Sequence, residues 1–166
     1  MIPSFTANEC QRILGYSYGN TLTHSTFLFE NEDIDYNYYV IRRDNLSQWI
    51  FDKFKEYVNH LYPDNRADTM NEVYLHKYTT GCKFARHRDD IKYPDQVLNV
   101  GVTLGSFYKG GEFIAYDPYR VLGETPGEFY HMDASTEHEV LEVKEGTRHS
   151  LIQFFTYKEL LKQSTI

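Results

Sequence analysis

The chain has 166 residues, enough for one domain with a sizeable core, and a formal net charge of −7. This charge disfavours nucleic acid as a partner, because phosphate contacts need clustered Lys and Arg. Two cysteines are too few for a disulfide framework, and the sequence shows neither a signal peptide nor an apolar run of the roughly twenty residues that span a membrane. We expect a single cytoplasmic domain over 1–166 with no membrane partner, and the oligomeric state stays open.

The N-terminal part predicts one helix followed by two strands. Thr6 followed by Glu9 is a capping-box pattern, which predicts a helix over 7–14 that stops at the next glycine. Residues 16–45 then alternate polar and acidic residues with apolar and aromatic ones, which indicates two strands joined by an acidic turn at 30–33.

A second helix is predicted to follow the candidate caps Asp44 and Asn45 and to end before Pro63. The evidence is a set of apolar residues that recur at three- and four-residue intervals: Leu46, Ile50, Phe54, Tyr57 or Val58, and Leu61. These helices make the first 70 residues or so a helix-rich support.

From residue 71 the pattern changes to short β-type runs separated mostly by Gly, Pro or Asp. The predicted strands are 72–79, 96–105, 111–116, 127–132, 138–143 and 148–157, and a short helical or frayed tail follows over 158–166. The runs follow each other too closely for crossover helices. We therefore predict an α+β, mainly β fold: a double-stranded β-helix (jelly roll) over about 71–157, braced by the N-terminal helices.

Three residues form a candidate metal site: His87 and Asp89 in a His-Arg-Asp run, and His138 further along the chain. Two imidazoles and one carboxylate on one face of an iron ion leave three positions free, the ligand set of non-haem Fe(II) oxygenases. Alternate residues of an extended chain share a face, so His87 and Asp89 can reach one metal. On the same alternation, Asp90 should face away.

Other histidines are weaker candidates. His131-Met132-Asp133 repeats the spacing, but it lacks the residues that surround the first motif, and we interpret it as the strand and turn that lead to His138. His24, His60 and His76 have no partner at metal-ligand spacing, so hydrogen-bonded or exposed histidines explain them.

The surrounding sequence resembles the prolyl 4-hydroxylase-like branch of the Fe(II)/2-oxoglutarate dioxygenases. The resemblance covers about residues 70–157 and rests on five elements in order: Tyr78-Thr79-Thr80-Gly81, Phe84, His87-Arg88-Asp89, Gly110-Gly111-Glu112 and His138 with Arg148 ten residues later. It implies Fe(II) held by His87, Asp89 and His138, with 2-oxoglutarate and O2 as co-substrates and ascorbate as a further candidate cofactor. The related halogenases lack the aspartate that corresponds to Asp89, so its presence here excludes them.

The resemblance also implies residues that bind 2-oxoglutarate. Arg148 matches the basic anchor of the co-substrate, Tyr78 matches a tyrosine that hydrogen-bonds it, and Thr103 lies where relatives carry a hydroxyl against its carboxylate. The plainer alternatives are a solvated arginine and a core tyrosine. Substrate-rim candidates are the Tyr- and Asn-rich segment 16–41 and the loop 90–95.

Three functions follow from these patterns. The leading one is a 2-oxoglutarate-dependent hydroxylase of peptidyl proline, with a proline-containing peptide or protein as partner. The second is a hydroxylase of a free amino acid or another small molecule, because motifs identify the co-substrate better than the prime substrate. The rival from another class is a jelly-roll protein that binds a metal or ligand without catalysis. A nucleic-acid demethylase is opposed by the net charge.

Overall fold

A computed structural model describes residues 1–19, 23–29, 32–63 and 71–156. The chain begins with helix α1 (Ala7–Gly15), followed by a single 3-10 turn, η1 (Tyr16–Gly19). The predicted capping box is present: the Glu9 backbone N–H donates to Thr6 Oγ1 at 3.1 Å, and the Thr6 N–H donates to Glu9 Oε1 at 3.0 Å. Two N–H groups that the helix cannot satisfy are thereby paired.

Helix α2 (Gln48–Leu61) confirms the second predicted helix but begins later than its apolar pattern indicated. Leu46 lies before the helix and is 71% exposed, so its place in the buried stripe was wrong. The reason is a local turn, in which Asp44 Oδ1 accepts the backbone N–H groups of Leu46 and Ser47 at 2.8 and 2.9 Å. The remaining stripe is buried, from Ile50 to Val58.

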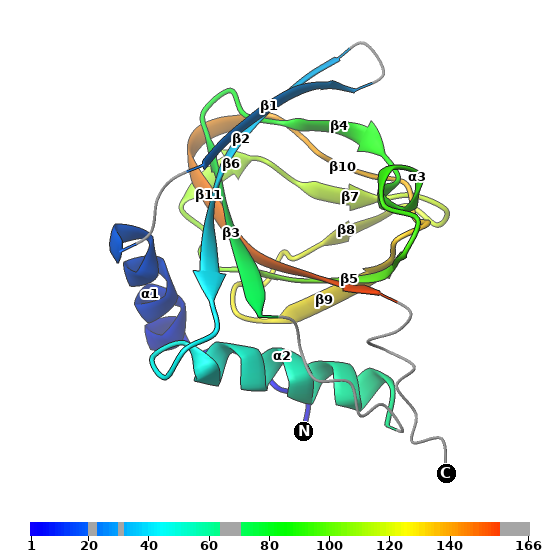
Figure 1. The fold of residues 1–166 in the computed structure, drawn as a ribbon. Coiled ribbons are helices and arrows are strands. Elements are labelled where there is room, and N and C mark those ends of the chain that lie inside the picture. Colours follow the sequence, from blue (N-terminus) through cyan, green and yellow to red (C-terminus); the bar gives the residue numbers. More distant parts are fainter. Residues whose placement is uncertain (20–22, 30–31, 64–70, 157–166) are drawn as a thin grey trace.

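Antiparallel strands make up two sheets that face each other (Figure 1). The larger sheet has the order β1-β2-β3-β11-β5-β9, with β6 paired to the first part of β11, and the smaller has the order β4-β10-β7-β8. Their bounds are β1 Thr23–Phe29, β2 Glu32–Arg42, β3 Glu72–Thr79, β4 Phe84–His87, β5 Gln96–Thr103, β6 Tyr108–Gly110, β7 Phe113–Ala115, β8 Arg120–Leu122, β9 Phe129–Asp133, β10 His138–Val140 and β11 Val143–Thr156. A short helix, α3 (Asp89–Lys92), follows β4.

Helices α1 and α2 cover the outer face of the larger sheet, while the inner face is turned toward the smaller sheet (Figure 1). Strand β5 shows how one strand serves both faces. Leu98, Val100 and Val102 belong to the core cluster that includes residues of both helices. The residues that alternate with them, Asn99, Gly101 and Thr103, face the opposite way, toward the interior between the sheets.

The predicted fold class, mainly β and braced by helices, is confirmed. Five short elements were not predicted: η1, β4, α3, β6 and β8 have only three or four residues each, too few to show a periodic pattern. The predicted strand 138–143 is split, because β10 ends at Val140 and β11 begins at Val143. Residues 30–31 of the acidic turn and the tail from 157 lie outside the described residues.

Within the described part of the chain, no helix combines the length and the apolar character needed to cross a membrane.

Candidate active site

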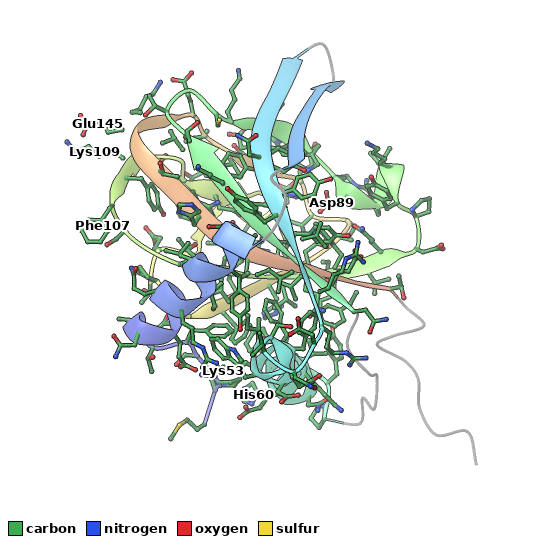
Figure 2. All side chains as sticks on the ribbon, turned by 60° about the vertical axis from the view of Figure 1, so that its left-hand side comes forward. Lys53, His60, Asp89, Phe107, Lys109 and Glu145 are labelled. Carbon is green, nitrogen blue, oxygen red and sulfur yellow. The ribbon has the colours of Figure 1, made fainter. Side chains whose placement is uncertain are left out.

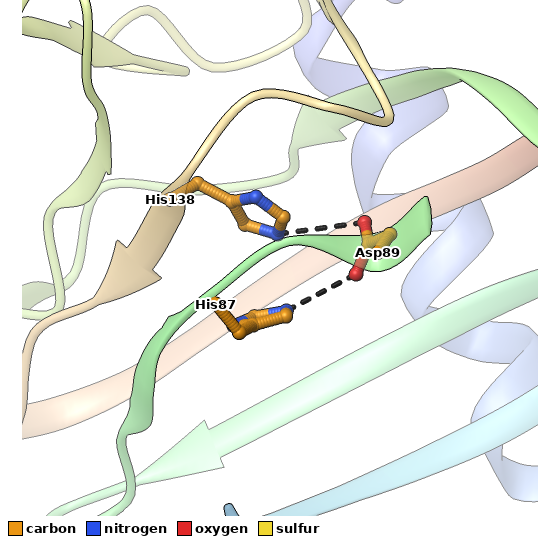
Figure 3. Close-up of side chains that lie close together, drawn as sticks. All are labelled: His87, Asp89 and His138. Carbon is orange, nitrogen blue, oxygen red and sulfur yellow. Dashed lines mark hydrogen bonds and ion pairs between the residues drawn. The ribbon is translucent and has the colours of Figure 1, made fainter. Parts of the chain in front are cut away.

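His87, Asp89 and His138 come together between the sheets (Figure 3). Asp89 Oδ1 lies 3.1 Å from His87 Nε2, and Asp89 Oδ2 lies 3.5 Å from His138 Nε2. Two ligands bound at about 2.1 Å from one metal ion lie about 3.0 Å apart at a right angle and about 3.4 Å apart at a tetrahedral angle. The observed separations therefore match ligands on one face of a single metal ion.

Strand pairing accounts for the approach of the two histidines. His87 ends β4 and His138 begins β10, and the two residues are cross-strand partners. Their ring centroids are 4.2 Å apart. Both are buried, at 8% and 5% exposure, so a bound ion would be shielded from bulk water on this side.

Backbone carbonyls orient both imidazoles. His87 Nδ1 lies 2.7 Å from the Ala85 carbonyl oxygen, and His138 Nδ1 lies 2.9 Å from that of Thr136. A carbonyl oxygen can only accept, so each Nδ1 carries the hydrogen and donates, which leaves Nε2 directed at Asp89. Burial lowers the pKa of His138 to about 4 although Asp89 opposes this, so its Nε2 offers a lone pair at neutral pH.

The carboxylate of Asp89 is held from a third direction by Asn99, whose Nδ2 donates to Asp89 Oδ2. Burial alone would raise the pKa of Asp89, but a hydrogen bond with His87, the charge that each imidazole carries when protonated, and the Asn99 amide hold the pKa below its usual value. The site is thus a cluster of acceptor atoms around an ionised carboxylate. A cation completes such a cluster, because it is the only common species that satisfies all of them at once.

The expected strand geometry around Asp89 is wrong in one respect. Asp89 and Asp90 are the first residues of α3 rather than strand neighbours, and their backbone N–H groups both donate to the Ala134 carbonyl at 3.2 Å. Arg88 before them is extended, which is why Asp89 still turns toward His87. Asp90 is engaged elsewhere, since Arg88 donates to both of its carboxylate oxygens at 3.0 and 2.7 Å.

A cavity of about 560 Å³ includes the metal group and reaches Arg148 on β11. Arg148 is 2% exposed, and its guanidinium carbon lies 5.9 Å from each of the ring centroids of Tyr78 and Phe113. Its Nη1 donates to Ser150 Oγ at 3.3 Å. No carboxylate among the described residues forms an ion pair with Arg148. A buried cation is costly without an anion, so this end of the cavity suits a carboxylate ligand.

Two buried hydroxyls lie at the same end. Thr103 Oγ1 has no hydrogen-bond partner in the described part of the chain, and Tyr130 Oη has none of good geometry there, although it interacts with the Arg148 guanidinium. Tyr130 pairs across the strands with Gly101, and a Cβ on that glycine would lie 2.4 Å from the Tyr130 ring. A Cβ on Gly123 would lie 2.6 Å from Thr103 Oγ1. The two glycines therefore leave the space that the tyrosine ring occupies beside Arg148.

The turn at Gly110 and Gly111 packs against the arginine from outside. Both have positive φ, 72° and 66°, as expected for this pair. A Cβ on Gly111 would lie 2.9 Å from Val143 Cγ2 and 3.3 Å from Arg148 Cδ. The glycine pair thus brings the chain against the aliphatic part of the arginine side chain as well as closing a turn.

One wall of the cavity is aromatic. Tyr36 and Tyr38 of the predicted rim segment line it, and Tyr36 stacks on Tyr78 at 5.4 Å between centroids. From the predicted rim loop, Lys92 and Tyr93 line it as well. Residues 20–22 and 30–31 of the rim segment lie outside the described residues.

The structure brings five of the six predicted site residues to this cavity: His87, Asp89, His138, Arg148 and Tyr78. The sixth, Thr103, is fully buried beneath Gly123 instead of lining it. Among the cavity residues that sequence reasoning missed are His76, Asn99 and Tyr130. Strand alternation could have indicated the first, which lies two positions before Tyr78. His76 was interpreted as an ordinary histidine, yet it faces the cavity, where burial lowers its pKa to about 3.

Comparison with known proteins supports the fold. No family model and no curated protein sequence matches this chain. An oxidoreductase of the 2OG-Fe(II) oxygenase family from Burkholderia pseudomallei matches its structure with a TM-score of 0.74 at 19% identity, over 93% of this chain and 83% of that one. The chain has the fold of the 2OG-Fe(II) oxygenases.

Prolyl hydroxylases are among the structures that share this fold, and two of them illustrate the likeness. One, from Trichoplax adhaerens, was solved with a peptide fragment of the hypoxia inducible factor oxygen degradation domain (TM-score 0.64, 14% identity, 90% of this chain and 77% of that one). The other is a viral collagen prolyl hydroxylase from Paramecium Bursaria Chlorella virus-1, in complex with 2OG (TM-score 0.60, 17% identity, 90% and 89%). The fold predicted from the sequence motifs is therefore confirmed.

Proposed function

We propose that this chain is an Fe(II)- and 2-oxoglutarate-dependent hydroxylase. The observation that carries the proposal is the pairing, within one cavity, of a three-residue metal group with a buried guanidinium that no described carboxylate neutralises. A dicarboxylate with a 2-oxo acid group at one end suits both features. Bound together, Fe(II), 2-oxoglutarate and O2 would supply the oxidising chemistry, converting a C–H bond to C–OH as 2-oxoglutarate becomes succinate and CO2.

The side chains have separate tasks in this proposal. His87, Asp89 and His138 hold the iron through Nε2, a carboxylate oxygen and Nε2, and Asn99 keeps the carboxylate oriented. The guanidinium of Arg148 binds the distal carboxylate of 2-oxoglutarate with parallel hydrogen bonds.

Hydroxyl groups complete the co-substrate pocket. Of the two buried hydroxyls at the Arg148 end, that of Tyr130 lines the cavity and can donate to a carboxylate, whereas that of Thr103 lies beneath Gly123. Burial raises the pKa of Tyr130, so its hydroxyl stays protonated and able to donate. Tyr78 closes the pocket as a buried ring beside the guanidinium. Tyr130 therefore takes the role that the sequence suggested for Thr103, because its hydroxyl is the one that lines the cavity.

For the prime substrate we propose a peptidyl proline. Three structural neighbours are named prolyl hydroxylases, and one was solved with a peptide. The tyrosines of β2 and the loop after α3 give the cavity aromatic walls, which suit the apolar ring of proline. A free amino acid or another small molecule is the alternative, since a cavity of about 560 Å³ can also accept it.

Mass spectrometry tests this proposal directly. Incubation with Fe(II), 2-oxoglutarate, O2 and a library of proline-containing peptides should yield succinate and peptides that gain one oxygen on proline. The Asp89→Ala variant is the negative control. Oxygen on free amino acids only would favour the small-molecule alternative. Absence of succinate, with every substrate and without any, would favour a non-catalytic binding protein.

A further inference from the structure

The smaller sheet presents a connected set of charged and aromatic side chains on its outer face, directly behind the metal group. Arg86 immediately precedes His87, and Glu137 immediately precedes His138. Because neighbouring strand residues alternate between faces, these two point away from the cavity while the histidines point into it. Arg86 Nε and Nη2 both donate to Glu137 Oε2, at 3.1 and 2.5 Å.

Tyr116, which directly follows β7, and Glu139 on β10 extend the set. The guanidinium carbon of Arg86 lies 3.7 Å from the centroid of the Tyr116 ring, a close cation–π contact. The Tyr116 hydroxyl donates to Glu139 Oε1 at 2.7 Å, and its backbone N–H donates to the Glu137 carbonyl at 2.9 Å. We call Arg86, Tyr116, Glu137 and Glu139 the outer clamp.

The backbone alone holds β4 weakly at this point. Among the described strands β4 lies at the edge of its sheet and pairs only with β10. That pairing has two register partners, His138 with His87 and Val140 with Phe84, and the register shifts between them. A strand with so few ladder hydrogen bonds can slide or tilt, and such movement would change the separation of the two imidazoles.

We propose that the outer clamp sets the spacing of His87 and His138 and that its members are positioning residues for the metal site. An exposed ion pair by itself contributes little, and Arg86 and Glu137 are 45% and 43% exposed. Here the pair is reinforced by a stacked ring and a second hydrogen bond, and it joins the two strands one residue from each ligand. Its effect therefore falls on ligand geometry more than on stability. This inference rests on the metal site of the proposed function.

The test uses Co(II) alone as probe, with its dissociation constant measured by calorimetry and its ligand-field absorption by spectroscopy. Arg86→Gln and Glu137→Gln should each weaken Co(II) binding about tenfold and shift the absorption bands, an effect typical of residues that orient metal ligands. The double variant should bind no more weakly than either single one, because both substitutions remove the same interaction. Thermal unfolding without metal should change little.

The matched control is the cross-strand ion pair of Lys109 and Glu145, which joins β6 to β11 at 3.0 Å. Figure 2 shows this pair on the other side of the molecule from Asp89. Lys109→Gln should leave Co(II) affinity unchanged. Unchanged Co(II) affinity in both clamp variants, or an equal loss of affinity in the control, would overturn the proposal for the outer clamp and leave the metal site standing. A wild-type chain that binds no Co(II) would overturn the metal site and with it the proposed function.

Discussion

Tyr130→Phe should have opposite effects on stability and on co-substrate binding. The substitution removes one hydroxyl that is buried beside the Arg148 guanidinium and has no hydrogen bond of good geometry to the described residues. A buried polar group without a hydrogen bond destabilises the folded state by roughly 1–3 kcal/mol. Its removal, with the ring kept in its place above Gly101, should therefore raise the free energy of unfolding by about 1 kcal/mol.

Binding of 2-oxoglutarate should weaken in the same variant. A hydrogen bond from this hydroxyl to a carboxylate is worth about 1.5–3 kcal/mol, which corresponds to roughly 10- to 100-fold in the dissociation constant. Urea unfolding gives the stability of the protein without ligand. Calorimetric titration of the Co(II)-loaded protein with 2-oxoglutarate gives the affinity.

Tyr57→Phe is the control. The Tyr57 hydroxyl lies 2.7 Å from His131 Nδ1, on α2 and outside the cavity. Its loss should lower stability by about 1 kcal/mol and leave 2-oxoglutarate affinity unchanged. If Tyr130→Phe instead lowers stability and leaves the affinity intact, the hydroxyl has a structural partner and the assignment to the co-substrate pocket is refuted.

Three further predictions concern other residues of the cavity. Asp89→Ala should abolish Co(II) binding in calorimetry, whereas Asp90→Ala should retain it, because Asp90 is paired with Arg88. Equal losses of Co(II) binding in the two variants would contradict the assignment of Asp89 as the ligand. Arg148→Lys should weaken 2-oxoglutarate binding by about tenfold without affecting metal binding, since an ammonium cannot present two parallel donors. An unchanged dissociation constant for 2-oxoglutarate would exclude Arg148 from the co-substrate pocket. The folded protein keeps His76 neutral down to about pH 3, whereas the unfolded chain protonates it near pH 6.5. The contribution of His76 to folding stability is therefore complete above pH 6.5 and is lost as the pH falls toward 3. His76→Gln should therefore flatten the acid side of the stability curve by up to about 1.4 kcal/mol per pH unit, and a slope like that of the wild type would contradict the burial of this imidazole.

Much of the framework could be predicted from local patterns. The capping box at Thr6 and the apolar stripe of α2 depend on neighbours three or four residues apart, and they are visible in the sequence. Strands of five or more residues were found, but β4 was not, since four residues give too little alternation. The helical start at Asp89 depends on the Ala134 carbonyl, a contact from a distant segment.

The composition of the cavity was harder to predict than its metal group. Asn99 becomes relevant only when β5 lies beside α3, and Tyr130 only when its ring crosses to Gly101 on the paired strand. Both depend on the register between strands, which the sequence pattern leaves undetermined. Chemistry-bearing residues at motif spacing are therefore predictable, whereas those delivered across strands need the structure.

The alternating faces of β5 have a consequence for how the protein tolerates mutation. Substitutions at Leu98, Val100 and Val102 disturb the packing against the helices, so they should reduce the amount of folded protein in a cell. Asn99 and Gly101 face the cavity, where Asn99 holds the Asp89 carboxylate and a Cβ at Gly101 would displace the Tyr130 ring, so substitutions there should reduce activity more than the amount of folded protein. Between Leu98 and Val102, losses of folded protein and losses of activity would then alternate along the strand, with a period of two.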